Sequence, residues 1–278
     1  MTTRVMVLEA AGPEAGALVA AAIANGYEVH AVTQPDYFLG YGPDLRSVLA
    51  GHLLTDFTRP ATALSQIIAY GRQVGAHGAL TTNEYLTPLL ALACEALGLP
   101  GNDPTLAPAS RDKAVMHAAF VEHGVATPRT RVVRHQDLRS MVTADEIAFP
   151  AVIKPATGAG SAGVTVVHTH DRCMEAWREA QAVTDMYGSR GEPLVLVQDY
   201  ITGTEYSVES FTQYGTTTHV GVTKKIVTSG SYRVELGHSL PTHLPLAVEQ
   251  KIHAQTERAI TAVGGLFTTQ LSIIAQAL

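Results

Sequence analysis

The sequence predicts an α/β fold in which a parallel-sheet domain is followed by a more antiparallel region. Over the first hundred residues, short apolar strands alternate with alanine-rich helical stretches, a pattern typical of parallel βαβ units. The segment 101–109 is rich in turn-forming residues and marks a domain boundary. The chain has 278 residues, which is enough for about two domains at roughly 150 residues each.

The first region repeats strand and helix in turn. Gly26 and Gly75 stand where helices should end, because glycine adopts the left-handed conformation of a C-cap, and Pro60 stands where a helix begins. Parallel sheets bind ligands beyond the carboxyl ends of their strands, which here predicts a site near Gln34 and residues 82–84. We expect strands over 4–8, over 28–32, from Leu53 and over 79–81, and helices over 13–25, 60–75 and 84–97.

The second region mixes helices with strands. Ser110 can cap a helix that ends at Gly124, and Tyr214-Gly215 can form the turn between two antiparallel strands. The expected strands are 130–133, 151–155, 164–168, 194–198, 205–212, 218–227 and 268–271, and the expected helices are 111–123, 136–142, 171–187 and 245–263.

The composition excludes several classes of protein. Hydrophobic residues make up 46% of the chain and charged residues 16%, which indicates a globular protein with a real core. The net charge of -6 argues against a nucleic-acid partner. Two cysteines are too few for a disulfide framework and suit a reducing cytoplasm. No apolar run approaches the ~18 residues of a membrane span. We therefore expect a cytoplasmic protein without a nucleic-acid or membrane partner.

A glycine-rich loop, Gly158-Ala-Gly-Ser-Ala-Gly163, is the first motif that suggests chemistry. Its GxGxxG spacing also occurs in dinucleotide-binding folds, but those need a helix after the glycines, and here the residues 164–167 favour a strand. A kinase loop lies between strands but has its lysine after the glycines, whereas Lys154 precedes them. Both interpretations therefore fail.

A glycine-rich flap on a β-hairpin remains. Small residues allow backbone N–H groups to approach phosphate oxygens, and Ser161 can add a hydroxyl. Lys154 on the incoming strand can supply a positive charge to the same phosphates. The alternative is an ordinary flexible hairpin without a ligand.

Several motifs follow one another in a recognisable order. They are Ser110-Arg-Asp-Lys113, Phe149-Pro-Ala-Val-Ile-Lys-Pro155 with the glycine loop, Val197-Gln-Asp-Tyr-Ile-Thr-Gly-Thr-Glu205, and Val234-Glu-Leu-Gly-His238. This succession resembles the ATP-grasp ligases, in particular those that join a carboxylate to an amine, such as L-amino acid ligases. The resemblance implies a preATP-grasp domain over 1–108, an ATP-grasp small subdomain over 109–198 and a large subdomain over 199–278. We expect the last subdomain to be incomplete and the C-terminus to be shortened.

The resemblance also implies a nucleotide site. Lys113 and Lys154 would contact the phosphates, Glu205 would hold the ribose hydroxyls, and a hinge would read the adenine edge with its backbone. A solvated strand-edge acid at 205 and a helix-surface lysine at 113 are the alternatives. The expected flap residues are Gly158, Gly160, Ser161 and Gly163, and the expected hinge residues are Gln198, Asp199, Tyr200 and Ile201.

Candidates for substrate binding are Glu84, Arg233, Glu235 and His238. Glu84 follows a parallel strand and could face a ligand, or it could simply stabilise the first turn of its helix. The other three lie beyond the predicted hairpin, where the related ligases position an amino-acid substrate.

The implied reaction uses ATP and Mg²⁺ to convert a carboxylate into an acylphosphate, which an amine then attacks to form an amide. Catalysis in the family rests on positioning and charge neutralisation, so no side chain is assigned as catalytic. Gln270 stands where the family has its first metal-binding glutamate, and no metal ligand is assigned. The sequence therefore leaves two functions open: a ligase of small carboxylates and amines, able to form a homodimer, or an ATP-binding protein without the magnesium site.

Overall fold

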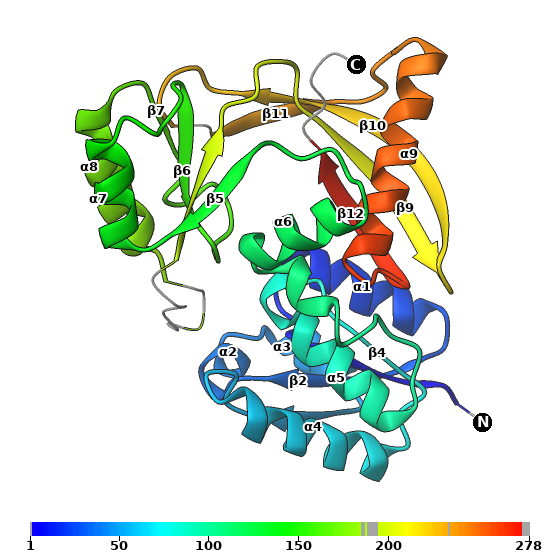
Figure 1. Ribbon diagram of the computed structural model, residues 1–278. Coiled ribbons are helices and arrows are strands. Elements are labelled where there is room, and N and C mark those ends of the chain that lie inside the picture. The colour runs from blue at the N-terminus through cyan, green and yellow to red at the C-terminus, as the bar shows by residue number, and fades with distance from the viewer. Residues whose placement is uncertain (1, 185–186, 188–193, 233, 274–278) are drawn as a thin grey trace. The chain divides into compact units, whose positions relative to one another are not determined.

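The computed structural model describes residues 2–184, 187, 194–232 and 234–273. The side chains of residues 268–273 lie outside this description. The chain divides into two compact units, Met1–Ala107 and Pro108–Leu278 (Figure 1). Within the described part of the chain, none of the helices has the length and apolar character needed to cross a membrane.

The first unit is built on a parallel sheet with strand order β3-β2-β1-β4, which confirms the predicted parallel arrangement. The central strands are apolar on both faces, and Val7, Val29 and Val32 are fully buried, as expected for a sheet covered on both sides. The strands are β1 Arg4–Leu8, β2 Glu28–Thr33, β3 Gly51–Leu54 and β4 Gly78–Leu80, and the longer helices are α1 Pro13–Ala24, α4 Pro60–Val74 and α5 Thr87–Leu97.

Two short helices of this unit, α2 Pro35–Leu39 and α3 Pro43–Val48, were not predicted. Each begins with proline at its first turn and has only five or six residues, too few for a helical period to be visible in the sequence. The predicted helix over 84–97 also differs at its start, because η1, Glu84–Leu86, is a 3₁₀ turn that precedes α5.

The second unit opens with α6, Lys113–Glu122, and here the predicted cap was wrong. The carboxylate of Asp112, rather than Ser110, accepts hydrogen bonds from the backbone N–H groups of Ala114 and Val115, at 2.7 and 3.2 Å. Ser110 instead belongs to η2, the 3₁₀ turn Ala107–Ser110. The helix therefore starts two residues later than expected, with Lys113 as its first residue.

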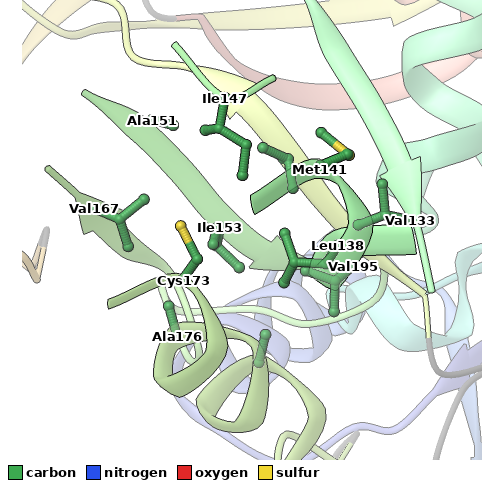
Figure 2. Packing of buried hydrophobic residues seen from close by; sticks show 12 residues of the cluster. Val133, Leu138, Met141, Ile147, Ala151, Ile153, Val167, Cys173, Ala176 and Val195 are labelled. Atoms are coloured by element: carbon green, nitrogen blue, oxygen red, sulfur yellow. The ribbon is translucent and has the colours of Figure 1, made fainter. Parts of the chain in front are cut away.

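A first antiparallel sheet of the second unit has strand order β5-β8-β6-β7. Helices α7 and α8 cover one face, where Leu138, Ile153 and Val195 are fully buried and point toward one another (Figure 2). The elements are β5 Thr130–Val133, α7 His135–Thr143, β6 Ala151–Pro155, β7 Thr165–Val167, α8 His170–Gln181 and β8 Val195–Asp199. Helix α8 thus ends before the predicted limit of 187, because β-branched Val183 and Thr184 follow its C-cap at Ala182.

A second antiparallel sheet has strand order β11-β10-β9-β12. The predicted turn at Tyr214-Gly215 is confirmed, and both residues have positive φ, 50° and 75°. Helix α9 packs on the sheet through Ile252, which contacts Val208 and Val222. The elements are β9 Tyr206–Gln213, β10 Thr216–Val227, β11 Glu235–Ser239, α9 Leu246–Ala262 and β12 Phe267–Ile273. Strand β11 was not predicted as a strand.

Backbone hydrogen bonds join the two sheets of this unit. Thr165 of β7 forms an isolated antiparallel bridge with Tyr232, and the N–H of Val166 donates to the carbonyl oxygen of Ser231 at 2.8 Å. The segment that connects β10 to β11 therefore pairs with the strand that leaves the glycine-rich loop.

Candidate functional site

Lys154 lies on β6, on the face of the sheet opposite the helices. Strand alternation places Ile153 in the core and the neighbouring Lys154 on the other face. Its ammonium group donates a hydrogen bond to the side-chain oxygen of Gln198 on β8, at 2.8 Å. The amide nitrogen of Gln198 in turn donates to the hydroxyl of Thr130 on β5, also at 2.8 Å. Three neighbouring strands thus hold one lysine in place.

The surroundings of Lys154 disfavour its charge. Burial, and to a smaller extent the nearby positive charge of Lys113, lower the pKa of Lys154 to about 8. His117 on α6 lies in the same environment, where burial and then the charge of Lys154 lower its pKa. A half-buried cluster of basic groups is suited to receive an anion, which would stabilise the charged form of the lysine.

Lys113 connects α6 to the glycine-rich loop. Its backbone N–H donates to the carbonyl oxygen of Ala156 at 2.8 Å, and its ammonium group donates to that of Gly158 at 2.7 Å. Lys113 and Lys154 are therefore brought to the same loop, one from a helix and the other from the incoming strand. The Lys113 charge is close enough to contribute to the lowered pKa of Lys154.

The loop itself has the backbone of a tight turn. Gly160, Ser161 and Gly163 have φ of 60°, 61° and 67°. At Gly163 a Cβ atom would come within 2.9 Å of the Cα of Ala180 on α8, whereas at Gly160 it would meet nothing within 4 Å. The loop is consequently fixed at its end against α8 and open at its tip, where Ser161 is exposed. The strand β7 follows it, as the sequence predicts for a flap.

Residues 198–201 lie at the end of β8. The carboxylate of Asp199 forms an ion pair with Arg129 at 3.2 Å, and its N–H donates to the Arg129 carbonyl oxygen at 3.0 Å. The N–H of Tyr200 donates to the carbonyl oxygen of Pro150 at 3.3 Å. Ile201, the next residue, is half-buried. These contacts fix the backbone where the chain leaves the sheet.

A second charged cluster lies on β10 and β11. The ammonium group of Lys225 contacts Glu235 at 2.8 Å and Glu205 at 3.6 Å, and His238 contacts Glu235 at 2.9 Å. Burial alone would lower the pKa of Lys225, but the hydrogen bond that its ammonium group donates to Glu235 and the two carboxylate charges outweigh burial and raise the pKa. The hydrogen bond from Lys225 is the main reason that the pKa of Glu235 is lowered.

Lys225 joins three residues that the sequence singles out separately: Glu205, Glu235 and His238. Sequence reasoning missed Lys225, although one signal was present. In the pair Lys224-Lys225, strand alternation must place one lysine on each face of β10, and only the register of β11 shows which of them meets Glu235.

The remaining predicted residues do not join these clusters in the described structure. Glu84 lies in the first unit, in the 3₁₀ turn after β4. Arg233 and the side chain of Gln270 lie outside the described residues. Among the residues that the structure describes, no group of three or more His, Cys, Asp and Glu side chains could hold a metal ion. The described residues thus fit an anionic ligand at the lysines.

Comparison with protein families gives a match in both units. A model of the ATP-grasp domain matches residues 147–269, and a model of the ATP-grasp N-terminal domain matches residues 19–101. The chain belongs to the ATP-grasp superfamily. The predicted resemblance is therefore confirmed, as is the order of a parallel sheet followed by the antiparallel sheets of the ATP-grasp fold. Lys154, the glycine-rich loop and Lys225 all lie within the match to the ATP-grasp domain.

Individual relatives show what this ATP-grasp chain resembles. It is 33% identical to the alanine–anticapsin ligase of Bacillus subtilis over 153 residues, which are 53% of this chain and 31% of that ligase. The L-amino acid ligase of Bacillus licheniformis has a similar fold, with a TM-score of 0.78 and 17% identity over 99% of this chain and 64% of that one. The chain therefore spans less than two thirds of the length of these ligases.

Another ATP-grasp structure with the same fold was determined with nucleotide. It is the biotin carboxylase domain dimer of the 2-oxoglutarate carboxylase of Hydrogenobacter thermophilus, in complex with MgADP, ADP and bicarbonate. Its TM-score is 0.76, with 17% identity over 100% of this chain and 62% of that one.

Proposed function

We propose that this ATP-grasp chain binds ATP and acts in a carboxylate–amine ligase that forms an amide or peptide bond. One observation carries the proposal: two lysines from different elements, Lys113 and Lys154, meet at a glycine-rich loop. The ammonium group of Lys154 is held by a neutral amide oxygen, so its charge can act on phosphate oxygens. The similarity to the alanine–anticapsin ligase supports the choice of reaction class.

In this proposal each cluster binds a different part of the nucleotide. The two lysines would attract the negative charge of the phosphates. The residues that would bind the phosphates are Lys113, Lys154, Gly158, Gly160, Ser161 and Gly163. The backbone of residues 198–201, fixed by the contacts of Asp199 and Tyr200, would read the adenine edge. Glu205 would accept hydrogen bonds from the ribose hydroxyls, and the Lys225 ammonium group lies 3.6 Å from its carboxylate.

The proposed reaction has two steps. A substrate carboxylate oxygen attacks the terminal phosphorus of ATP, which gives an acylphosphate and ADP. The amine of the second substrate then attacks the acyl carbon, phosphate leaves, and an amide forms. The chain's own residues would orient the phosphates and neutralise their charge rather than react covalently. Glu84, Arg233, Glu235 and His238 remain proposed contacts of the small-molecule substrates.

Magnesium enters only as the partner of the nucleotide, as in the MgADP complex of the related carboxylase domain. Because the described residues of this chain do not form a metal-binding group, no step is assigned to a protein-bound ion. A homodimer and a cytoplasmic location, where ATP is supplied, belong to the same proposal.

Titration calorimetry with ATP tests the phosphate site. A charge-assisted hydrogen bond contributes about 1.5–3 kcal/mol, so Lys154→Ala should weaken ATP binding by about ten- to a hundredfold. Val220→Ala is a matched control, because Val220 is an exposed residue in the bulge of β10. Equal ATP affinity of Lys154→Ala and the wild type would show that the phosphate role is wrong.

A second candidate function is an ATP-binding protein without turnover, which would need only the phosphate contacts of the two lysines and the loop. Release of ADP, measured with ATP, Mg²⁺ and pooled amino acids, separates the two. Amino-acid-dependent release would support the ligase and exclude the binding protein. Binding of ATP without any release would support the second function.

A further inference from the structure

The side chain of Gln198 occupies the middle of a hydrogen-bonded row across three strands. In the sheet order β5-β8-β6, Gln198 pairs with Thr130 on one side and with Val152 on the other. Its amide oxygen accepts from Lys154 and its amide nitrogen donates to Thr130. The row ends at the carbonyl oxygen of Pro128, which accepts from the Thr130 hydroxyl at 2.9 Å.

The chemistry of the row determines which way the amide faces. A threonine hydroxyl has a single hydrogen to donate, and Thr130 directs it to Pro128. Thr130 can therefore only accept from Gln198, which requires the amide nitrogen on that side and the amide oxygen on the side of Lys154. An ammonium group has no acceptor, so Lys154 selects the same orientation. Thr130 and Lys154 therefore require the same orientation of the Gln198 amide.

The partner that this row offers to Lys154 is neutral. Lys113 and His117, the titratable groups that act electrostatically with Lys154, lie on α6 and bring positive charge or none. A carboxylate at position 198 would accept the same hydrogen bond but would also neutralise the lysine. The amide oxygen can hold the ammonium group in place while leaving its charge to act on another anion.

We propose that Gln198 is a positioning residue that holds the Lys154 ammonium group at the glycine-rich loop and, being neutral, keeps its charge available for the nucleotide phosphates. The inference rests on the proposed function, and it gives the Gln198 side chain a role separate from the adenine contacts of the backbone around it. Thr130 supports this role because it fixes the orientation of the amide.

Proton uptake is an independent consequence of this arrangement. The pKa of Lys154 in the free protein is about 8, so at pH 8.5 roughly three quarters of the molecules carry a neutral lysine. Phosphate oxygens favour the charged form, so nucleotide binding at this pH should take up about 0.7 proton per site. With a carboxylate at position 198, Lys154 would already be charged and the uptake would disappear.

Titration calorimetry with ATP at pH 8.5, in two buffers with different heats of ionisation, measures affinity and proton uptake together. We expect Gln198→Glu, which has nearly the same shape, to bind ATP about tenfold more weakly and to lose the uptake. Thr130→Val should weaken binding severalfold because the amide is no longer oriented, and Thr130→Ser should restore it. Melting temperatures of all variants identify any that fail to fold.

The outcomes separate this inference from the proposed function. If the wild type binds no ATP, the nucleotide site itself is wrong, and the role of Gln198 falls with it. If the wild type binds ATP but Gln198→Glu keeps both the affinity and the proton uptake, the site stands and the positioning role is wrong. If Gln198→Glu does not fold, the pair Thr130→Val and Thr130→Ser decides, and equal binding by both overturns the inference.

Discussion

The two lysine clusters of the second unit use the same side chain in opposite ways. Lys154 faces a neutral amide oxygen and a second lysine, and its pKa falls to about 8. Lys225 lies between Glu205 and Glu235, and its pKa rises. Burial disfavours the charge of both lysines, most strongly at Lys154, and only Lys225 has carboxylate partners that outweigh it. A lysine with acidic partners stabilises the folded protein. A charged lysine with only a neutral partner lowers that stability, and in the proposed function its charge acts on the nucleotide phosphates.

The largest expected change in the free energy of unfolding comes from replacing Lys154. At pH 7 the lysine is charged in a site that disfavours charge, because its pKa of about 8 lies below the ordinary 10.5. Replacing it with methionine removes this cost, so Lys154→Met should raise the free energy of unfolding by about 3 kcal/mol. Urea denaturation at pH 7 measures the change. A lower stability for Lys154→Met would contradict the idea of a reserved charge.

The stability gained by Lys154→Met should depend on pH. Between the folded pKa of about 8 and the ordinary 10.5, the unfolded chain binds more protons at Lys154 than the folded chain does. The contribution of this group to stability therefore rises with pH in that window. The advantage of Lys154→Met should be constant below pH 8, shrink above it and vanish near pH 10.5. Denaturation curves at several pH values in this range measure it, and a difference that does not change with pH would contradict it.

Lys225→Met should act in the opposite direction and more weakly. It removes the positive charge between two carboxylates, and partly exposed ion pairs contribute about 0.2–1 kcal/mol, so a loss of stability of that size is expected. The loss should shrink at high salt, because ions screen the repulsion left between the carboxylates. Denaturation in low and high sodium chloride measures both effects. A gain in stability would show that Lys225, like Lys154, destabilises the folded protein.

The smallest expected effect is that of Glu235→Gln. The pKa of Glu235 is lowered in the folded protein, mainly by the hydrogen bond from Lys225. The carboxylate therefore contributes stability above the ordinary pKa of 4.5, and this contribution is lost as the pH falls below that value. Glu235→Gln should reduce stability by about 0.5 kcal/mol or less at pH 7, and the reduction should shrink as the pH falls below 4.5. An effect that persists in acid would indicate lost packing instead.

Local signals in the sequence predicted much of the fold. The β-branched strand 151–155 and the turn at Tyr214-Gly215 were predicted because their signals lie within a few residues. The helices α2 and α3 were missed because they are too short to show a period. Strand β11 was missed because its five residues include a glycine and two charged or titratable side chains, and only pairing with β10 makes it a strand.

In the candidate site, too, only the features with local sequence signals were predicted. Lys154 and the glycine-rich loop are adjacent in sequence, so their spacing was informative. The contacts of Lys154 with Gln198 and of Lys225 with Glu235 depend on which residues face each other across paired strands. A shift of one residue in register would exchange the faces of a strand. Contacts of this kind follow from the assembled sheet rather than from any local pattern.

Lys113 joins the start of α6 to the glycine-rich loop. Its amide hydrogen and its ammonium group are bonded to two carbonyl oxygens of the loop, those of Ala156 and Gly158. If the base of the loop moves away from α6, at least one of these bonds must break. The hydrogen-exchange rate of the Lys113 amide should therefore report how often the loop opens, and it should fall when a bound ligand holds the loop closed.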